Sequence, residues 1–192
     1  MRPRVGVLAL QGAFAAHARV LAELDANPVE VRTPAQLDRV DALVMPGGES
    51  TTMSFLLDSS ELREPLTERL RDGLPALGTC AGMIMLARDV LDGRDDQRSL
   101  DVIDITVRRN AFGRQRESFE ADLEIAGLQG GPFPAVFIRA PFVERVGEGV
   151  VVEASVDGHP VLCRAGTITV CSFHPELSHD LRLHERFLEG LA

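Results

Sequence analysis

The sequence has few cysteines, a deficit of basic residues and no long hydrophobic run, and each shortage excludes a class of protein. Its three cysteines, Cys80, Cys163 and Cys171, are an odd number without paired spacing, so neither a disulfide scaffold nor a zinc site is expected. The 20 basic residues are outnumbered by 29 acidic ones, which gives a formal net charge of -9. A chain this acidic is repelled by nucleic acid and by anionic membrane surfaces, so we expect neither as a partner.

No apolar stretch approaches the ~18 unbroken residues that a membrane-spanning helix needs. The run Val5–Leu10 follows a basic start, but it is too short for a secretion signal and ends at Gln11-Gly12, so we interpret it as a first strand. Unpaired cysteines favour a reducing cytoplasm as the compartment. With 192 residues, of which 45% are hydrophobic and 26% charged, the chain fits one globular domain, residues 1–192, better than two.

The first half of the chain predicts strands that alternate with helices. Apolar runs predict strands at 5–10, 29–32, 42–45 and 75–78, and helical periodicity predicts helices at 13–24, 51–57, 62–71 and 81–90. This rhythm indicates right-handed βαβ units. We therefore expect an α/β fold with a mostly parallel central sheet covered by helices on both faces.

The second half changes to closely spaced strands. They are expected at 102–107, 135–138, 150–155, 160–164 and 167–171, before an amphipathic helix near 180–191. Asp157-Gly158 and Ala165-Gly166 are turn sequences between the last three strands, which predicts an antiparallel extension attached to the parallel sheet. The charged segment 91–99 is expected to be an exposed loop.

The sharpest local signal is Gly78-Thr-Cys80-Ala-Gly82, where a predicted strand ends at Cys80 and a predicted helix follows at once. This pattern is typical of a nucleophile elbow, with cysteine where related hydrolases carry serine. The flanking glycines let strand and helix approach closely, and N–H groups at the helix N-terminus favour the thiolate. The amide of Ala81 could bind a developing oxyanion. Because free cysteines are more often simply buried in a core, the motif needs a base to support catalysis.

The candidate base follows the last predicted strand, in His174-Pro-Glu176. In an extended chain alternate side chains point the same way, so Glu176 is expected to orient His174 from the same face. Cys80, His174 and Glu176 would then be the nucleophile, base and orienting carboxylate of covalent acyl transfer. By itself, the tripeptide is more typical of a surface turn.

A glycine-rich loop, Gly47-Gly48, follows another predicted strand and precedes a helix that Ser50 or Thr51 could cap. It lies at the strand ends where open α/β sheets bind ligands, so its amides could supply a second oxyanion donor or hold a substrate. Such loops also bind phosphate or simply turn the chain. Two arginine-containing segments, 108–115 and 137–141, are either carboxylate-binding or merely solvated.

The remaining histidines are not expected to form a site. His179 and His184 lie five residues apart, which separates them by about 140° around a helix. His17 and His159 are isolated in the sequence. Solvated or capping roles are expected for all four, and we expect neither a metal site nor a cofactor.

These motifs resemble those of the triad-type (class I) glutamine amidotransferases. Within that class the sequence is similar to the glutaminase subunits of pyridoxal 5′-phosphate synthase, which make vitamin B6. The similarity runs through segments 10–14, 46–53, 109–115, 118–122, 137–141 and 172–176. Segments 109–115 and 118–122 are specific to the subfamily, whereas the triad is shared widely.

The resemblance implies a flavodoxin-like three-layer fold and a glutaminase that hydrolyses L-glutamine to L-glutamate and ammonia through a thioester on Cys80, with His174 and Glu176 as its relay. The substrate contacts it implies are Gly48, Glu49, Ser50, Arg109, Ile138 and Arg139. Backbone amides of Gly48 and Ala81 are expected to hold the oxyanion. Ammonia would pass to a separate (β/α)₈-barrel synthase subunit, without which the glutaminase is poorly active.

Two features depart from the pattern that the resemblance implies. The segment 91–99 is richer in charge than expected, and Arg108 stands where an acidic residue is expected. Two alternatives stay open, a glutaminase of another pathway, such as imidazole glycerol phosphate synthesis, and a non-catalytic regulatory subunit on the same fold. Segment 109–115 argues against the first, and the complete triad argues against the second.

Overall fold

The computed structural model describes residues 2–109 and 118–191, so most of segment 109–115 lies outside the described residues. The first-half elements are β1 (Arg4–Leu8), α1 (Phe14–Glu23), β2 (Asn27–Val31), α2 (Pro34–Leu37), β3 (Ala42–Met45), α3 (Ser50–Ser59), α4 (Arg63–Arg71), β4 (Ala76–Thr79) and α5 (Ala81–Leu86). The second-half elements are β5 (Ala87–Leu91), β6 (Ile103–Arg108), β7 (Ser118–Leu123), β8 (Phe133–Ile138), β9 (Phe142–Val146), β10 (Val151–Val156), β11 (His159–Ala165), β12 (Ile168–Cys171), the 3₁₀ helix η1 (Pro175–Leu177) and α6 (Arg182–Glu189).

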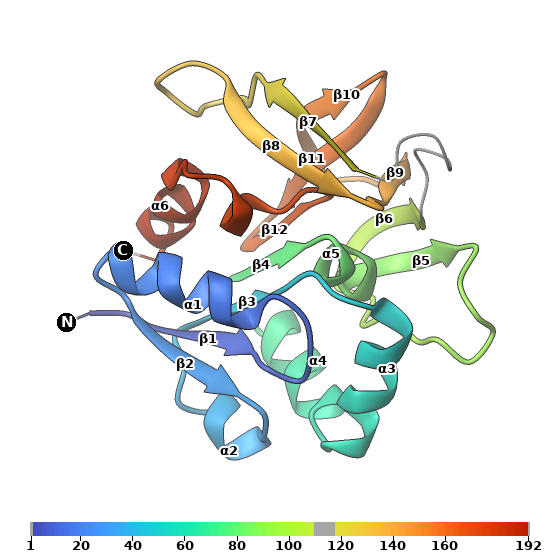
Figure 1. The fold of residues 1–192 in the computed structure, drawn as a ribbon. Helices are drawn as coiled ribbons and strands as arrows, with labels where there is room; N and C mark the ends of the chain where they lie inside the picture. The colour runs from blue at the N-terminus through green and yellow to red at the C-terminus, as the bar shows by residue number, and fades with distance from the viewer. Residues whose placement is uncertain (1, 110–117, 192) are drawn as a thin grey trace.

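Within the described residues, seven strands form the central sheet, in the order β10-β11-β12-β4-β3-β1-β2 (Figure 1). The pairs β2–β1, β1–β3, β3–β4 and β4–β12 are parallel. This part follows the 2-1-3-4-5 strand order of flavodoxin-like folds. The pairs β12–β11 and β11–β10 are antiparallel, which confirms the predicted extension.

Helices cover both faces of this sheet and make three layers, with α1 and α6 on one face and α3, α4 and α5 on the other (Figure 1). Side chains alternate along a strand, so Val5 and Val7 of β1 pack on the α1 and α6 side while Leu8 packs on the other. Burial of each such side chain contributes about 1.5–3 kcal/mol. Apolar contacts on both faces explain why these strands read as continuous apolar runs.

Two of the predicted second-half strands lie outside the central sheet. The strand expected at 102–107 is β6, which pairs with β5 and β9, and the strand expected at 135–138 is part of β8, which pairs with β7. The helix predicted at 81–90 ends at Leu86, and Ala87–Leu91 forms β5 instead. Parallel pairing with β6 overrides local helical propensity there, because β6 supplies its backbone partners. Segment 91–99 is mostly exposed beyond the end of β5, as predicted.

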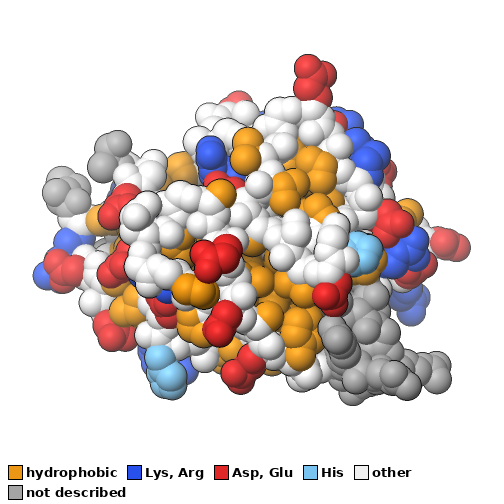
Figure 2. All heavy atoms as spheres, turned by 90° about the horizontal axis from the view of Figure 1, so that it is seen from above, with side chains coloured by type: hydrophobic (Ala, Val, Ile, Leu, Met, Phe, Trp, Pro, Cys, Tyr) orange, Lys and Arg blue, Asp and Glu red, His pale blue; other side chains and the backbone are white. Residues whose placement is uncertain are grey.

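The molecular surface reflects the acidic composition. Seen from above the view of Figure 1, acidic side chains are scattered among patches of exposed hydrophobic side chains (Figure 2). None of the helices in the described ranges has the length and apolar character needed to cross a bilayer.

Candidate active site

Cys80 lies in a tight turn between β4 and α5, with φ 49° and ψ -103°. Such a backbone is strained for a residue with a side chain, and it persists only where the surroundings enforce it. The flanking glycines allow the close packing that does so. A Cβ on Gly78 would lie 3.0 Å from the Gly82 carbonyl oxygen, and one on Gly82 would lie 2.0 Å from the carbonyl oxygen of Met45. The Cys80 amide donates to the carbonyl of Cys171 at 2.8 Å, which ties the turn to β12.

His174 and Glu176 form a close buried pair, with 2.8 Å between His174 Nδ1 and Glu176 Oε1. The extended backbone assumed in the sequence analysis is wrong, because Pro175–Leu177 forms a 3₁₀ helix. Proline suits the first position of such a helix, since its fixed φ is already helical. The His174 amide donates to the Val136 carbonyl of β8 at 2.8 Å, so the imidazole is anchored by a second sheet.

The charges of this pair suit a thiol nucleophile. Burial lowers the pKa of His174, but hydrogen bonds to Cys80 and Glu176 outweigh it and raise the pKa to about 10. Burial raises the pKa of Glu176, but the hydrogen bond from His174 outweighs that effect and lowers the pKa. The imidazolium of His174 therefore lies within hydrogen-bonding reach of both the Cys80 sulfur and the Glu176 carboxylate, where it can donate a proton.

The other two cysteines lie in apolar surroundings. Burial raises the pKa of Cys163 to about 12, and it raises the pKa of Cys171 well above its usual value. Both therefore stay as thiols at neutral pH. Cys80 is the cysteine that lines a cavity together with a histidine.

A cavity of about 360 Å³ opens in front of Cys80 and His174. Its wall contains all six residues that the resemblance assigned to substrate binding, together with Ile84, which the sequence analysis did not name. The lining is Gly48, Glu49, Ser50, Cys80, Ile84, Arg109, Ile138, Arg139 and His174. Ala81 lies beside Cys80 at the start of α5 and is buried. A volume of this size is typical of small-molecule sites.

The loop before α3 is held tightly against the triad. A Cβ on Gly47 would lie 2.4 Å from His174 Cε1, so a larger residue would displace the imidazole. The Gln11 side chain makes two hydrogen bonds to the Glu49 backbone. Its Oε1 accepts from the Glu49 amide at 3.2 Å, and its Nε2 donates to the Glu49 carbonyl at 3.3 Å. The sequence analysis did not assign Gln11 to the site, because nothing local shows that residues 38 positions apart meet.

Glu49 itself caps α3, which corrects the prediction that Ser50 or Thr51 does so. Its carboxylate accepts from the Thr51 amide at 3.1 Å and from the Thr52 amide at 2.7 Å. The Arg109 guanidinium lies 3.3 Å from the same carboxylate. The cavity rim therefore carries one negative and one positive group close together.

Backbone strain also occurs at a second residue of the cavity wall. Arg139 has φ 43°, which is unfavourable for a long side chain, and the Cys80 sulfur lies 4.0 Å from the Ile138 carbonyl oxygen. The cavity wall therefore contains two residues with strained backbones, Cys80 and Arg139. Such strain is tolerated where function requires one conformation.

Two histidines that were expected to be solvated are buried behind the triad, so that expectation is wrong. His17 of α1 and His184 of α6 are both 0% exposed. His17 Nδ1 lies 2.9 Å from His184 Nε2, and His17 Nε2 lies 3.2 Å from both Thr79 Oγ1 and Glu176 Oε2. His179 is exposed, as expected.

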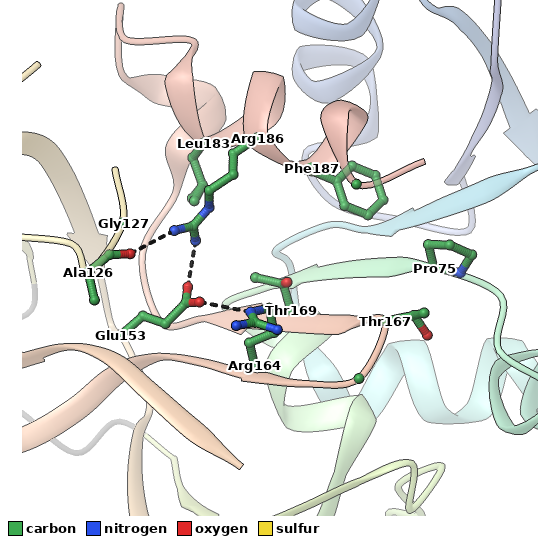
Figure 3. Close-up of a pocket in the computed structure, with 12 residues that line it drawn as sticks. Pro75, Ala126, Gly127, Glu153, Arg164, Thr167, Thr169, Leu183, Arg186 and Phe187 are labelled. Carbon is green, nitrogen blue, oxygen red and sulfur yellow. Dashed lines mark hydrogen bonds and ion pairs between the residues drawn. The ribbon is translucent and has the colours of Figure 1, made fainter. Parts of the chain in front are cut away.

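Another cavity, of about 420 Å³, lies at the amino ends of β4 and β12, opposite the triad (Figure 3). Here the buried Glu153 carboxylate lies between two arginines, with 2.9 Å from Oε1 to Arg164 Nε and 2.6 Å from Oε2 to Arg186 Nη2. Arg186 also donates to the Ala126 carbonyl at 3.2 Å. The lining contains neither cysteine nor histidine, so it lacks a nucleophile–base pair. Among residues 2–109 and 118–191, no group of His, Cys, Asp and Glu side chains is arranged to hold a metal ion.

The fold and the site define a class of protein. A sulfur nucleophile and an imidazole that can protonate the leaving nitrogen can together cleave an amide through a covalent intermediate. Both open here on one small cavity at the carboxyl ends of a flavodoxin-like sheet. This is the arrangement of a cysteine-dependent amide hydrolase. Residues 7–192 match the model of the SNO glutamine amidotransferase family, and the chain belongs to this family.

Known proteins resemble the chain over nearly its whole length. The pyridoxal 5′-phosphate synthase subunit PdxT of Salinispora arenicola (strain CNS-205) is 56% identical over 192 residues, covering 97% of this chain and 96% of that protein. The protein of the same name from Rhodococcus opacus (strain B4) is 55% identical, covering 98% and 96%. A crystal structure of a glutamine amidotransferase superimposes with a TM-score of 0.92 at 48% identity, covering 97% of this chain and 98% of that one.

Proposed function

We propose that this chain is the glutaminase subunit of a pyridoxal 5′-phosphate synthase and releases ammonia from L-glutamine. The family and the names of its relatives support this assignment. The observation that carries it is the cavity, whose wall joins Cys80 and His174 to every substrate contact that the resemblance implied.

The reaction begins at Cys80. Its thiolate attacks the carbon of the glutamine side-chain amide and forms a tetrahedral intermediate with negative charge on oxygen. Backbone amides of Gly48 and Ala81 stabilise that charge, and donors fixed in place beforehand are most effective in a site that excludes water. The strained turn holds the Cys80 side chain at the N-terminus of α5, from where it makes this attack.

His174 then moves the protons. As an imidazolium it protonates the amide nitrogen, so that ammonia leaves and a thioester remains on Cys80. As a neutral base it removes a proton from water, which attacks the thioester and releases glutamate and the thiolate. Glu176, 2.8 Å from Nδ1, keeps the ring oriented and stabilises its charged form throughout.

Free glutamine carries a negative carboxylate and a positive amino group. Glu49, Arg109 and Arg139 place charges of both signs on the cavity wall, as recognition of such a molecule requires. Ser50 and the backbone at Ile138 add polar contacts. These groups select an amino acid rather than a simple amide.

The ammonia passes to a separate (β/α)₈-barrel synthase subunit, and activity depends on docking to it. The relatives are named as subunits of that synthase, which supports a partner. The three free cysteines suit a reducing compartment such as the cytoplasm.

Glutaminase assays with different partners test the proposal. Glutamate release should rise strongly when the cognate pyridoxal phosphate synthase subunit is added and should stay at its basal level with the cyclase of imidazole glycerol phosphate synthesis. Stimulation by the cyclase alone would assign the chain to the other pathway. A glutamine-mimicking electrophile should modify Cys80, whereas a non-catalytic regulatory subunit would leave that thiol unmodified.

A further inference from the structure

A chain of buried polar groups continues beyond the triad into the protein. Glu176 uses Oε1 for His174, and its other oxygen, Oε2, is buried without an aligned hydrogen-bond partner. The Nε2 atom of His17 lies 3.2 Å from that oxygen and 3.2 Å from Thr79 Oγ1. An orphaned carboxylate oxygen in a dry interior is costly, so a donor within reach of it has a strong electrostatic effect.

The hydrogen-bond pattern indicates which ring nitrogens carry protons. His184 Nδ1 is buried and has no hydrogen-bond partner. A buried N–H without an acceptor is rarer than an acceptor without a donor, so His184 should carry its proton on Nε2 and donate it to His17 Nδ1, 2.9 Å away. His17 must then carry its proton on Nε2, which faces Thr79 and Glu176.

Both rings are neutral in this arrangement. Burial outweighs the attraction of Glu176 and lowers the pKa of His17, and it lowers the pKa of His184 to about 3. The titratable groups that act on the pair are His174, at the start of η1, and Glu176 of η1. Cys171 of β12 in turn faces Glu176.

We propose that His17 is a positioning residue for glutamine hydrolysis, and that its Nε2–H turns from Thr79 to Glu176 Oε2 when His174 gives its proton to the leaving ammonia. Before that step the imidazolium of His174 balances the Glu176 charge. Afterwards the carboxylate faces a neutral ring, and the second donor replaces part of the lost stabilisation. The role of His184 is to fix the His17 tautomer, and the two helices that supply the rings, α1 and α6, lie side by side on one face of the sheet (Figure 1). This inference rests on the proposed function.

The first test compares two substitutions of His17, assayed with the synthase subunit. His17→Phe keeps a ring without the donor, and kcat should fall about tenfold with KM unchanged, because His17 is outside the cavity. His17→Gln keeps an N–H near the Nε2 position and should restore kcat to within about threefold of wild type. His179→Gln, at an exposed histidine, should match wild type.

The pH profile separates positioning from simple packing. Without the donor, Glu176 holds the proton on His174 more tightly, so the acid limb of kcat for His17→Phe should move upward by about half a pH unit or more. A purely structural histidine would lower the melting temperature of both variants alike and leave the profile in place. Equal kcat losses in both variants, or no loss in either, would overturn the proposal.

A measurement on the unmodified protein covers the case in which His17→Phe does not fold. Long-range ¹H–¹⁵N spectra of histidine-labelled protein report the tautomer of each ring. His184 should be unprotonated at Nδ1, and His17 should be protonated at Nε2. A protonated His184 Nδ1 would leave His17 unable to donate to Glu176 and would refute the inference, while the glutaminase assignment would stand or fall on its own assays.

Discussion

Two buried glutamates lie toward opposite ends of the strands of the central sheet and have opposite kinds of partner. Glu176 lies between the imidazoles of His174 and His17, whereas Glu153 lies between the guanidiniums of Arg164 and Arg186 (Figure 3). Arginine does not release its proton in proteins, whereas an imidazole does so readily. The partners of Glu176 can therefore change their protonation during a reaction, whereas Glu153 stays in fixed ion pairs.

The two environments differ in solvent access as well. The side chains of His17 and Glu176 are both fully buried, but Arg164 is 48% exposed beside Glu153. Water screens the Glu153 pairs, which limits their contribution to stability. At the carboxyl ends of the strands, the backbone of Cys80 is strained and Gly47 packs closely against His174. There the Glu176 Oε2 atom is also buried without a hydrogen-bond partner. Such strain is tolerated where a single conformation is needed, as the proposed active site requires.

The largest expected effect is a difference in glutamine turnover between substitutions of Cys80 and of Cys163. Cys80→Ala should lower glutamine turnover in the complex by about 10⁴-fold or more, because no covalent intermediate can form. Cys163→Ala, at a buried thiol whose pKa is influenced by burial and by Glu153, should keep near-normal turnover. Glutamate release measures both. Normal turnover by Cys80→Ala would remove the basis for the catalytic assignment.

Matched substitutions of the two glutamates should have opposite outcomes. Glu176→Gln should lower kcat by roughly 10³-fold while keeping the fold, because the amide no longer stabilises the imidazolium. Glu153→Gln should keep kcat but lower the free energy of unfolding by about 1–3 kcal/mol, because two guanidiniums lose their counter-charge. Urea unfolding and turnover of both variants would check this. Loss of activity in Glu153→Gln with an intact fold would undo the distinction.

A smaller effect is expected at Gly47, which packs against His174. Its alanine variant should lower kcat/KM by about 10²-fold, because the new methyl group displaces the imidazole from its position. Gly93→Ala is a suitable control, since a Cβ there meets its nearest neighbour, Val90, at an ordinary 3.4 Å. Equal kinetics for the two variants would show that this packing does not position the base.

The pH dependence of the free energy of unfolding should also reflect the raised pKa of His174. The folded-state pKa of His174 is raised to about 10, so its contribution to stability is complete below its unfolded value of 6.5 and is lost as pH rises through 10. Urea unfolding should therefore show a decrease of a few kcal/mol at most between those values. Glu176→Gln should show a smaller decrease, because one of the raising partners is gone. Stability that increased over this range in the wild type would contradict the assigned charges.

Much of the fold could be predicted from the sequence because its parallel strands are buried on both faces. Apolar runs such as 42–45 mark β3, and the glycines of Gly78-Thr-Cys80-Ala-Gly82 mark the elbow after β4. The segment Ala87–Leu91 could not be assigned in the same way. Its strand state depends on pairing with β6, which begins twelve residues after it ends, and no local pattern encodes that partner.

That Cys80, His174 and Glu176 lie together could be predicted, because two of them share one tripeptide and the third lies in a recognisable turn. The histidine pair behind them could not, because His17 and His184 are 167 residues apart. One signal was present in α1. His17 lies three residues after Phe14 and four before Leu21, on the buried stripe of the helix, where a solvated histidine does not belong.

The central claim is that Cys80 is the nucleophile activated by His174 and Glu176. Mass spectrometry of the complex, quenched with acid during glutamine turnover, tests it most directly. A glutamyl thioester should be found on the peptide that contains Cys80 and be absent from Cys80→Ala and from the peptides of Cys163 and Cys171. An adduct on either of those two thiols, or turnover that continues in Cys80→Ala, would contradict the account.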